Sequence, residues 1–317
     1  MRLRCRAPGK INLCLFVGRP RDDGYHSLVS LIQPVSLADE LMLDPADGDC
    51  DEVDCPGVEG ENLAARALAL YREAGWSGPP VRLTITKRVP VAGGMGGGSA
   101  DAAGALRLVA AAAQSEDRVL LGRLAQRLGS DVDALVDSQR CVIAGVGHRV
   151  IDLPDPVPFG ILLVPSAHRL STPDVYAEHD RLGLGRDADE LDRLTGAVGG
   201  AAHDQTLFAE RLLHNDLETA ARSLCPPIGG ALADVRAAGA VRVMVSGSGP
   251  TIFGLFPGAA GVAHAQAAAR DLRGRHPGAV AAAPVGRAYS RPAWLVGAAA
   301  LCVYGIVRRR AHGRTMP

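Results

Sequence analysis

The sequence lacks several features that mark particular classes of protein. Its 34 basic and 34 acidic residues cancel, so the chain has no net charge with which to attract nucleic acid or an anionic membrane. None of its seven cysteines forms a Cys-x-x-Cys pair, which favours free thiols in a reducing compartment. The N-terminal apolar run is short and has Lys10 and Asn12 at its edge, unlike a signal peptide. We therefore expect a cytoplasmic protein without a nucleic-acid partner.

Lysine is nearly absent as well. Of the 34 basic residues only Lys10 and Lys87 are lysines. Arginine cannot replace lysine where a compact point charge is required, so the two positions attract attention. A solvated strand lysine is the alternative for Lys10. For Lys87, a solvated strand face and a part in nucleotide binding explain the position equally well.

The hydrophobic pattern predicts an α+β fold of two lobes. Alternation over 1–45, interrupted by the turn "RDDGYH", predicts an antiparallel pair of strands. Helical spacing predicts helices over 61–75, 99–114 and 117–129. A second set of strands and helices begins near the apolar run 159–167. Within this second set, residues 183–205 have the least regular pattern of the interior.

One glycine-rich stretch lies between a predicted strand and a predicted helix. Gly93 to Gly98 contains five glycines, interrupted only by Met95. Glycines let backbone N–H groups approach phosphate oxygens, and a helix N-terminus adds partial positive charge. The P-loop pattern and the dinucleotide-binding pattern are both missing. We therefore predict a phosphate-binding turn of another type, with a tight loop that binds nothing as the alternative.

Three motifs in order, "PGKINL", "GGMGGGSADAA" and "SGSGPTIFGLF", resemble the signature motifs of the GHMP kinase superfamily. The stretches "RDDGYHSLVSL", "LGSDVDA", "STPDVY" and "NDLE" resemble the family of 4-diphosphocytidyl-2-C-methyl-D-erythritol kinases within it. The resemblance covers roughly 3–288. It implies a two-lobed GHMP kinase fold. A ribosomal protein S5 domain 2-like N-terminal lobe would span 1–155, an α/β C-terminal lobe 156–288, and an extension outside the catalytic fold 289–317.

The implied reaction is ATP-dependent phosphorylation of the 2-hydroxyl of 4-diphosphocytidyl-2-C-methyl-D-erythritol, in the non-mevalonate route to isoprenoid precursors. ATP would be co-substrate with Mg²⁺ accompanying it, and no residue is assigned as a metal ligand. The implied catalytic pair is Lys10 and Asp131. The carboxylate would take a proton from the hydroxyl, and the lysine would fix the carboxylate. For Asp131 the alternative is a helix-capping carboxylate.

The resemblance also implies the binding residues. The ATP-binding segment would be Pro90, Val91, Ala92, Gly93, Gly94, Met95, Gly96, Gly97, Gly98, Ser99 and Ala100. The substrate-binding residues would be Asn12, Tyr25, His26 and Tyr176. Both tyrosines would stack on the cytosine, His26 would pair with its edge, and Asn12 would contact polyol or phosphate. Ordinary half-buried aromatic residues are the alternative for the tyrosines.

Two positions depart from the family pattern. Asp133 stands where the family usually has proline. An extended segment would put Asp131 and Asp133 on one face, where like charges raise each other's pKa. His148 stands where the family usually has glutamate. Two further functions therefore stay open: another GHMP-type kinase, for mevalonate or homoserine, and a catalytically impaired binding homologue.

The C-terminal extension contains an uncharged run of fifteen residues, 293–307, followed by three arginines. A membrane-spanning helix needs about 20 apolar residues, so this run is too short. A peripheral helix on a membrane or partner is one hypothesis, and an extension without a role is the other. The sequence leaves the oligomeric state open.

Overall fold

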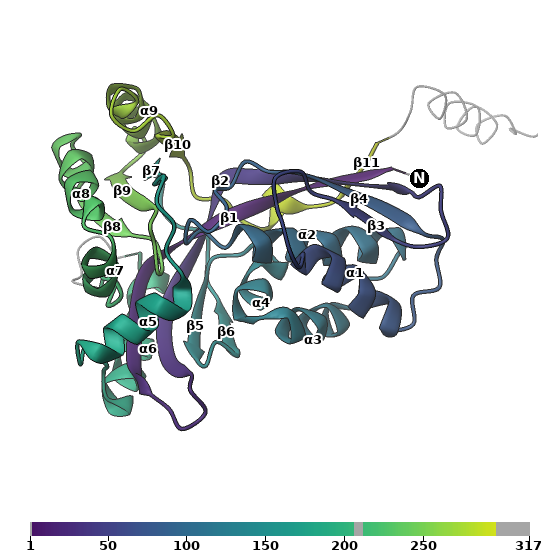
Figure 1. Cartoon of the computed structure of the whole chain (residues 1–317), viewed down its shortest axis with the longest axis horizontal. Helices are drawn as coiled ribbons and strands as arrows, with labels where there is room; N and C mark the ends of the chain where they lie inside the picture. The colour runs from purple at the N-terminus through teal and green to yellow at the C-terminus, as the bar shows by residue number, and fades with distance from the viewer. Residues whose placement is uncertain (1, 206–211, 296–317) are drawn as a thin grey trace, which may run out of the picture.

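The computed structural model describes residues 2–205 and 212–295, which form two lobes side by side (Figure 1). Two long antiparallel strands, β1 (Leu3–Pro20) and β2 (His26–Pro45), run through the N-terminal lobe and reach under the C-terminal one. The segment "RDDGYH" contains the turn that joins them. Both the predicted strand pair and the two-lobed α+β class are confirmed.

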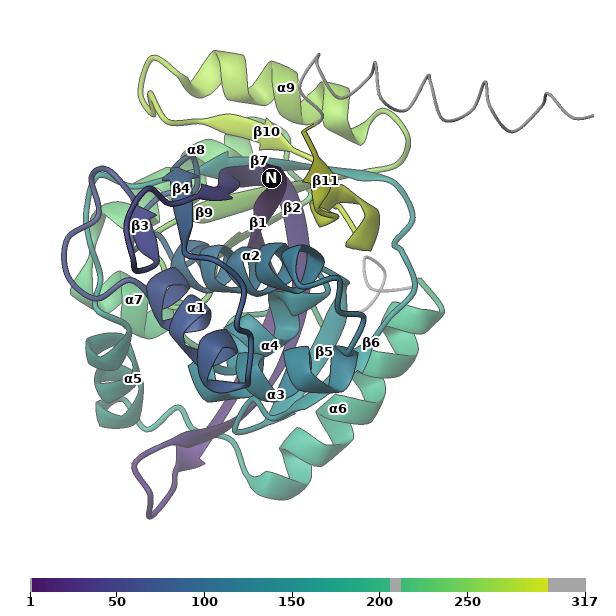
Figure 2. The same ribbon diagram turned by 90° about the vertical axis from the view of Figure 1, so that its right-hand side faces the viewer.

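The N-terminal lobe is a mixed sheet with helices on one face. Within the described residues the strand order is β11-β1-β2-β4-β3, and β2 also pairs with β5, which pairs with β6. These strands are β3 (Glu52–Asp54), β4 (Val81–Thr86), β5 (Cys141–Gly145), β6 (Arg149–Asp152) and β11 (Ala293–Trp294). The helices are α1 (Leu63–Glu73), α2 (Gly97–Ala112), α3 (Arg118–Leu128) and α4 (Ser130–Val136), gathered in front of the sheet in Figure 2. Leu68, Leu83 and Leu106 are buried between the two layers.

The C-terminal lobe is built on a second sheet of order β10-β7-β9-β8. Its strands are β7 (Phe159–Val164), β8 (Arg242–Val245), β9 (Ile252–Pro257) and β10 (Val280–Ala282). Its helices are α5 (Thr172–Arg181), α7 (Glu218–Leu224), α8 (Pro227–Ala237) and α9 (Gly261–Leu272). A shared core joins the lobes, because Phe16 of β1 packs in one cluster with Phe159 and Phe253. The hairpin therefore contributes to both lobes.

The interior segment predicted to be least regular is a helix, and that prediction is wrong. Residues Ala188–His203 form α6, which packs on β1, β2 and β5. Leu191, Val198 and Ala202 are buried along one face of it. Its three glycines lower the helical propensity, but burial of this apolar face outweighs the cost.

The segment that contains Asp131 and Asp133 is helical rather than extended, so the expectation of a shared face is also wrong. Both lie in the first turn of α4, where residues two apart do not face each other. Asp133 accepts a hydrogen bond from Gln126 (3.1 Å). Burial raises the pKa of Asp133, with a smaller contribution from Asp137. Asp131 takes no part in that shift.

Regular structure continues past Ala288, the predicted end of the C-terminal lobe. A short 3-10 helix, η1 (Arg287–Ser290), is followed by β11, which pairs with Leu3 and Arg4 of β1. The remainder of the extension, 296–317, lies outside the described residues, and so does most of the uncharged run. Among the helices of the described segments, none has the length and apolar character that a membrane crossing demands.

Candidate functional site

The glycine-rich stretch forms the turn into α2. Gly96, the residue before the helix, has φ +64°, and its carbonyl accepts the first helical bond from the Ala100 N–H. The N–H groups of Gly97, Gly98 and Ser99 precede that bond and have no acceptor within the helix. Free N–H groups and the helix dipole together make an anion site. The local structure therefore fits the predicted phosphate-binding turn.

The third motif holds this turn in place. The Ser246 hydroxyl donates to the Gly94 carbonyl (3.0 Å), and the Thr251 N–H donates to the Gly93 carbonyl (3.3 Å). A Cβ on Gly94 would lie 2.4 Å from the Ser246 carbonyl oxygen, so the approach requires glycine. Asn215 of "NDLE" in turn donates to the carbonyls of Val245 and Gly247 (2.8 Å each). Two motifs distant in sequence thus support the glycine turn.

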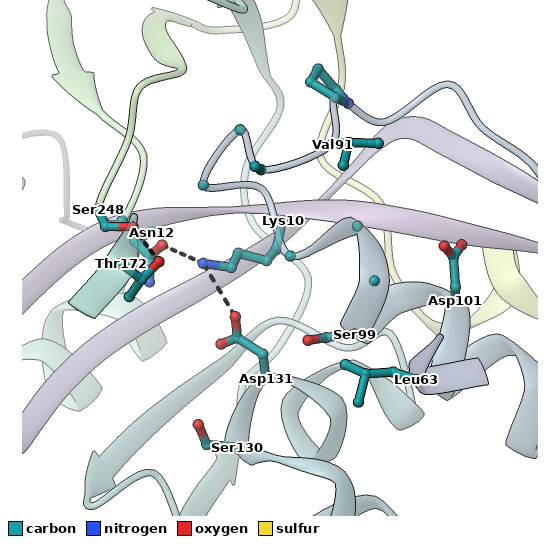
Figure 3. A pocket seen from close by; sticks show the side chains of 18 of the residues that line it. Lys10, Asn12, Leu63, Val91, Ser99, Asp101, Ser130, Asp131, Thr172 and Ser248 are labelled. Carbon is teal, nitrogen blue, oxygen red and sulfur yellow. Dashed lines mark hydrogen bonds and ion pairs between the residues drawn. The ribbon is translucent and has the colours of Figure 1, made fainter. Parts of the chain in front are cut away.

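Lys10 and Asp131 form an ion pair at the centre of the site (Figure 3). Lys10 Nζ lies 3.6 Å from Asp131 Oδ2 and donates to Asn12 Oδ1 at 2.8 Å. The Asn12 amide donates to the Ser30 hydroxyl (2.8 Å), which donates to the Cys14 carbonyl (2.6 Å). This series of hydrogen bonds between β1 and β2 fixes the position of the Lys10 side chain. Asn12, predicted as a substrate contact, lines the cavity but is engaged as a support for Lys10.

A cavity of about 490 Å³ surrounds the pair and the glycine turn. From the predicted ATP-binding segment it is lined by Pro90, Val91, Ala92, Gly93, Gly94, Gly96, Gly97, Gly98 and Ser99. Met95 and Ala100 instead have side chains buried in the core, 0% and 1% exposed, and support the turn from behind. Sequence reasoning missed Ser130, Thr172 and Ser248, whose hydroxyls also line the cavity. The motifs that contain them, "LGSDVDA", "STPDVY" and "SGSGPTIFGLF", indicate the family, but no pattern in the sequence singles out these hydroxyls.

A second cavity, of about 630 Å³, adjoins the first. It is lined by Tyr25, His26 and Tyr176, so the structure brings together the residues predicted to bind cytosine. Leu28, Ser130, Thr172 and Tyr176 line both cavities. Tyr25 is 69% exposed on the turn between β1 and β2, available for stacking. Burial raises the pKa of Tyr176 to about 12, so its hydroxyl stays protonated.

Lys87 lines the first cavity beside the glycine turn, whereas His148 lines neither cavity. Lys87 Nζ is held between Asp39 (2.5 Å) and Asp101 (2.6 Å), and its side chain is 14% exposed, so it does not lie on a solvated strand face. A Cβ on Gly97 would lie 3.3 Å from this Nζ, so the ammonium group borders the glycine turn, and its part in nucleotide binding stays a prediction. Burial raises the pKa of Asp101 to about 7 despite the lysine. The His148 ring lies over Gly145 at the β5–β6 turn and lines neither cavity.

Known proteins resemble this chain over most of its length. The GHMP kinases N terminal domain matches residues 62–142, and the GHMP kinases C terminal domain matches 195–273. A 4-diphosphocytidyl-2-C-methyl-D-erythritol kinase of Kineococcus radiotolerans is 40% identical, covering 84% of this chain and 83% of its own. One from Streptomyces coelicolor is 38% identical, covering 86% and 96%. The chain belongs to the 4-diphosphocytidyl-2-C-methyl-D-erythritol kinase family.

A solved structure agrees with this assignment. The crystal structure of a 4-(cytidine 5'-diphospho)-2C-methyl-D-erythritol kinase superposes with a TM-score of 0.73 at 34% identity, covering 89% of this chain and 100% of that one. The resemblance deduced from the motifs is therefore confirmed, and so are the GHMP kinase fold and the enzyme class, an ATP-dependent small-molecule kinase. The lobe boundaries and the roles of individual site residues stay predictions.

Proposed function

We propose that this kinase transfers the γ-phosphoryl group of ATP to the 2-hydroxyl of 4-diphosphocytidyl-2-C-methyl-D-erythritol, in the cytoplasm. The observation that carries the proposal is the place of the Lys10–Asp131 pair. Asp131 follows Ser130, which lines both the glycine-turn cavity and the cavity of Tyr25, His26 and Tyr176. A substrate hydroxyl placed where the two cavities meet would be close to both the Asp131 carboxylate and the glycine turn.

The Asp131 carboxylate would take the hydroxyl proton as the oxygen attacks the γ-phosphorus. A new P–O bond forms, the bond to the β,γ-bridging oxygen breaks, and ADP leaves. Lys10 holds the carboxylate in position and offsets the charge that develops on the transferring group. The N–H groups of Gly97, Gly98 and Ser99, which have no acceptor within the helix, bind the phosphate oxygens.

The ends of the two cavities suit the two nucleosides. Val58, Leu63 and Val91 are apolar side chains of the first cavity that would suit the adenine ring. Tyr25 and Tyr176 offer faces to the cytosine, each worth about 1–3 kcal/mol when a base stacks on it. ATP would bring Mg²⁺, whose preferred ligands are phosphate and hydroxyl oxygens. The Ser99 hydroxyl, which lines the phosphate end, fits that preference and would hold the ion.

The test is ADP formation with three acceptors: the cytidyl substrate, mevalonate and homoserine. We expect turnover with the cytidyl substrate, and rates at least 100-fold lower with the others because they offer no base to the second cavity. Comparable use of mevalonate or homoserine would contradict the proposed substrate. Binding of the cytidyl substrate and ATP without turnover would indicate an impaired homologue.

A further inference from the structure

Asp180 is a carboxylate of the second cavity that the proposed reaction does not use. It lies in the last turn of α5, four residues after Tyr176, so the two side chains share one face of the helix. Its Oδ1 is 2.8 Å from Nε2 of His26. The His26 side chain is 8% exposed and that of Asp180 29%. The bond is therefore shielded, yet both residues line the cavity.

The surroundings of His26 fix the ring as well. The centroid of the Tyr176 ring lies 5.0 Å from that of the His26 ring. The His179 ring also meets the His26 ring, edge-on, with 6.4 Å between centroids. His179 is fully buried, and burial lowers its pKa. Its Nδ1 is 3.7 Å from the same Asp180 oxygen, too far for a hydrogen bond. The carboxylate therefore acts on His26.

This geometry determines which ring nitrogen carries the proton. An ionised carboxylate can only accept hydrogen bonds, so the hydrogen lies on Nε2 of His26. In an uncharged imidazole, Nδ1 then carries a lone pair. No residue in the described segments makes a hydrogen bond to that Nδ1. We propose that Asp180 is a positioning residue that holds His26 with Nδ1 as an acceptor for the base of the substrate.

The consequence is a choice between bases, and it rests on the proposed function of this cavity. Cytosine presents an amino group, a donor, where uracil presents a carbonyl oxygen, an acceptor. An acceptor at Nδ1 of His26 can accept a hydrogen bond from the cytosine amino group, but its lone pair repels those of the uracil carbonyl oxygen. We expect a preference for cytosine of about tenfold to 100-fold, in the range of good base contacts. Asp180 thus sets the base preference without touching the base.

Calorimetric binding of CDP and UDP tests the inference on the full chain. Wild type should bind CDP about tenfold to 100-fold more tightly than UDP. Asp180→Ala frees the ring to turn, so the preference for CDP should fall below about threefold, while the Kd for ATP in the same calorimetric assay stays within about twofold of wild type. Asp180→Lys gives Nε2 a donor instead of an acceptor, which moves the ring proton to Nδ1 and should favour UDP. Asp174→Ala is the matched control, because Asp174 is exposed on the same helix and lines neither cavity.

Nitrogen-15 NMR of the imidazoles reads the tautomer directly, with His26→Gln to assign the signals. Wild type should show a protonated Nε2 and an unprotonated Nδ1. A protonated Nδ1, failure to bind either nucleotide, or equal losses of CDP and UDP affinity in Asp180→Ala would overturn the inference. Neither measurement needs turnover. Selective CDP binding by a protein that fails to phosphorylate the cytidyl substrate would contradict the proposed function alone, and turnover without base preference would contradict this inference alone.

Discussion

Lys10 reaches Asp131 beside the glycine turn, and its position depends on neighbours that have no chemical step in the proposed reaction. Its backbone N–H donates to the Met95 carbonyl (2.9 Å), and its side chain packs near the backbone of Gly96. The phosphate turn therefore also positions the lysine. A change in one residue of the turn is expected to affect both nucleotide binding and the catalytic pair.

Asp131→Asn should lower kcat by about 10²–10⁴, the range for loss of a general base. An amide keeps the size of the side chain but cannot take the proton, so the affinities for ATP and the cytidyl substrate should change little. The measurements are steady-state kinetics and calorimetry. Asp133→Asn is the matched control: Asp133 lies on the same helix, bonds to Gln126 and lines neither cavity, so kcat should stay within about twofold. Wild-type kcat in Asp131→Asn would remove the residue from the base role.

Gly96→Val should abolish measurable ATP binding. Valine disfavours the φ of +64° at this position, and a Cβ would lie 3.1 Å from the Lys10 side chain. The substitution therefore disturbs the turn and pushes on the catalytic lysine. Calorimetry with ATP, on protein whose circular dichroism spectrum is that of wild type, measures the effect. Retained ATP affinity would show that this turn is not the phosphate site.

At the scale of elements, the elements best predicted from sequence are those with a strong local signal. The strand pair 1–45, the first three helices and the glycine turn all carry periodicity or turn residues of their own. α4 has only seven residues, too few for a periodic pattern, and α6 owes its helix to packing on β1, β2 and β5. Thr172 and Ser248 share a hydrogen bond within the C-terminal lobe (2.9 Å), and Ser130 reaches the same cavity from the N-terminal lobe. Long-range packing thus determines what local patterns cannot predict.

Asp216 joins elements from both lobes. It accepts from the Val17 N–H of β1 (2.9 Å), from two nitrogens of Arg186 before α6 (2.6 and 2.8 Å), and from His214 (2.8 Å). Burial alone would raise the pKa of Asp216, but the hydrogen bonds from Arg186 and His214 outweigh it and lower the pKa to about 2. The folded state therefore stabilises the ionised form of Asp216 relative to the unfolded chain.

Asp216→Asn should lower the free energy of unfolding at pH 7 by about 2–3 kcal/mol. The folded pKa is below the unfolded value of about 3.9, so this stability is present above about pH 4 and is lost as the pH falls toward about 2. Urea denaturation at pH 7 and at pH 3 measures the change. The difference in the free energy of unfolding between wild type and Asp216→Asn should be smaller at pH 3 than at pH 7. The control is Asp192→Asn, at an exposed position of α6, which should leave the free energy of unfolding unchanged at both pH values. An equal difference in the free energy of unfolding at both pH values would show that Asp216 stabilises the fold independently of its charge.

At the scale of the whole molecule, residues 289–295 return from the C-terminal lobe to the N-terminal lobe and cover the edge of its sheet. The Tyr289 hydroxyl donates to the Ser36 carbonyl (2.7 Å), and the Arg6 guanidinium lies 4.6 Å from the Tyr289 ring centroid. Ser290 is 1% exposed, and the Leu295 N–H donates to the Arg2 carbonyl (2.9 Å). Residues 289–295 therefore pack on or pair with the N-terminal lobe. We propose that the catalytic fold includes residues up to Leu295 rather than ending at Ala288.

Two truncations test whether the fold ends at Ala288 or includes residues up to Leu295. Truncation after Ala288 removes Tyr289, Ser290 and β11, so the outer edge of β1 loses its partner, and the melting temperature should fall by several degrees, at about 2–4 °C per kcal/mol lost. Truncation after Leu295 keeps those contacts, so stability and kinase activity should match the full chain. Flotation with anionic liposomes tests the peripheral-helix hypothesis, since only the full chain would then float. A large loss of stability after Leu295 would place further residues in the fold, and an unchanged melting temperature after Ala288 would show that β11 adds nothing to it.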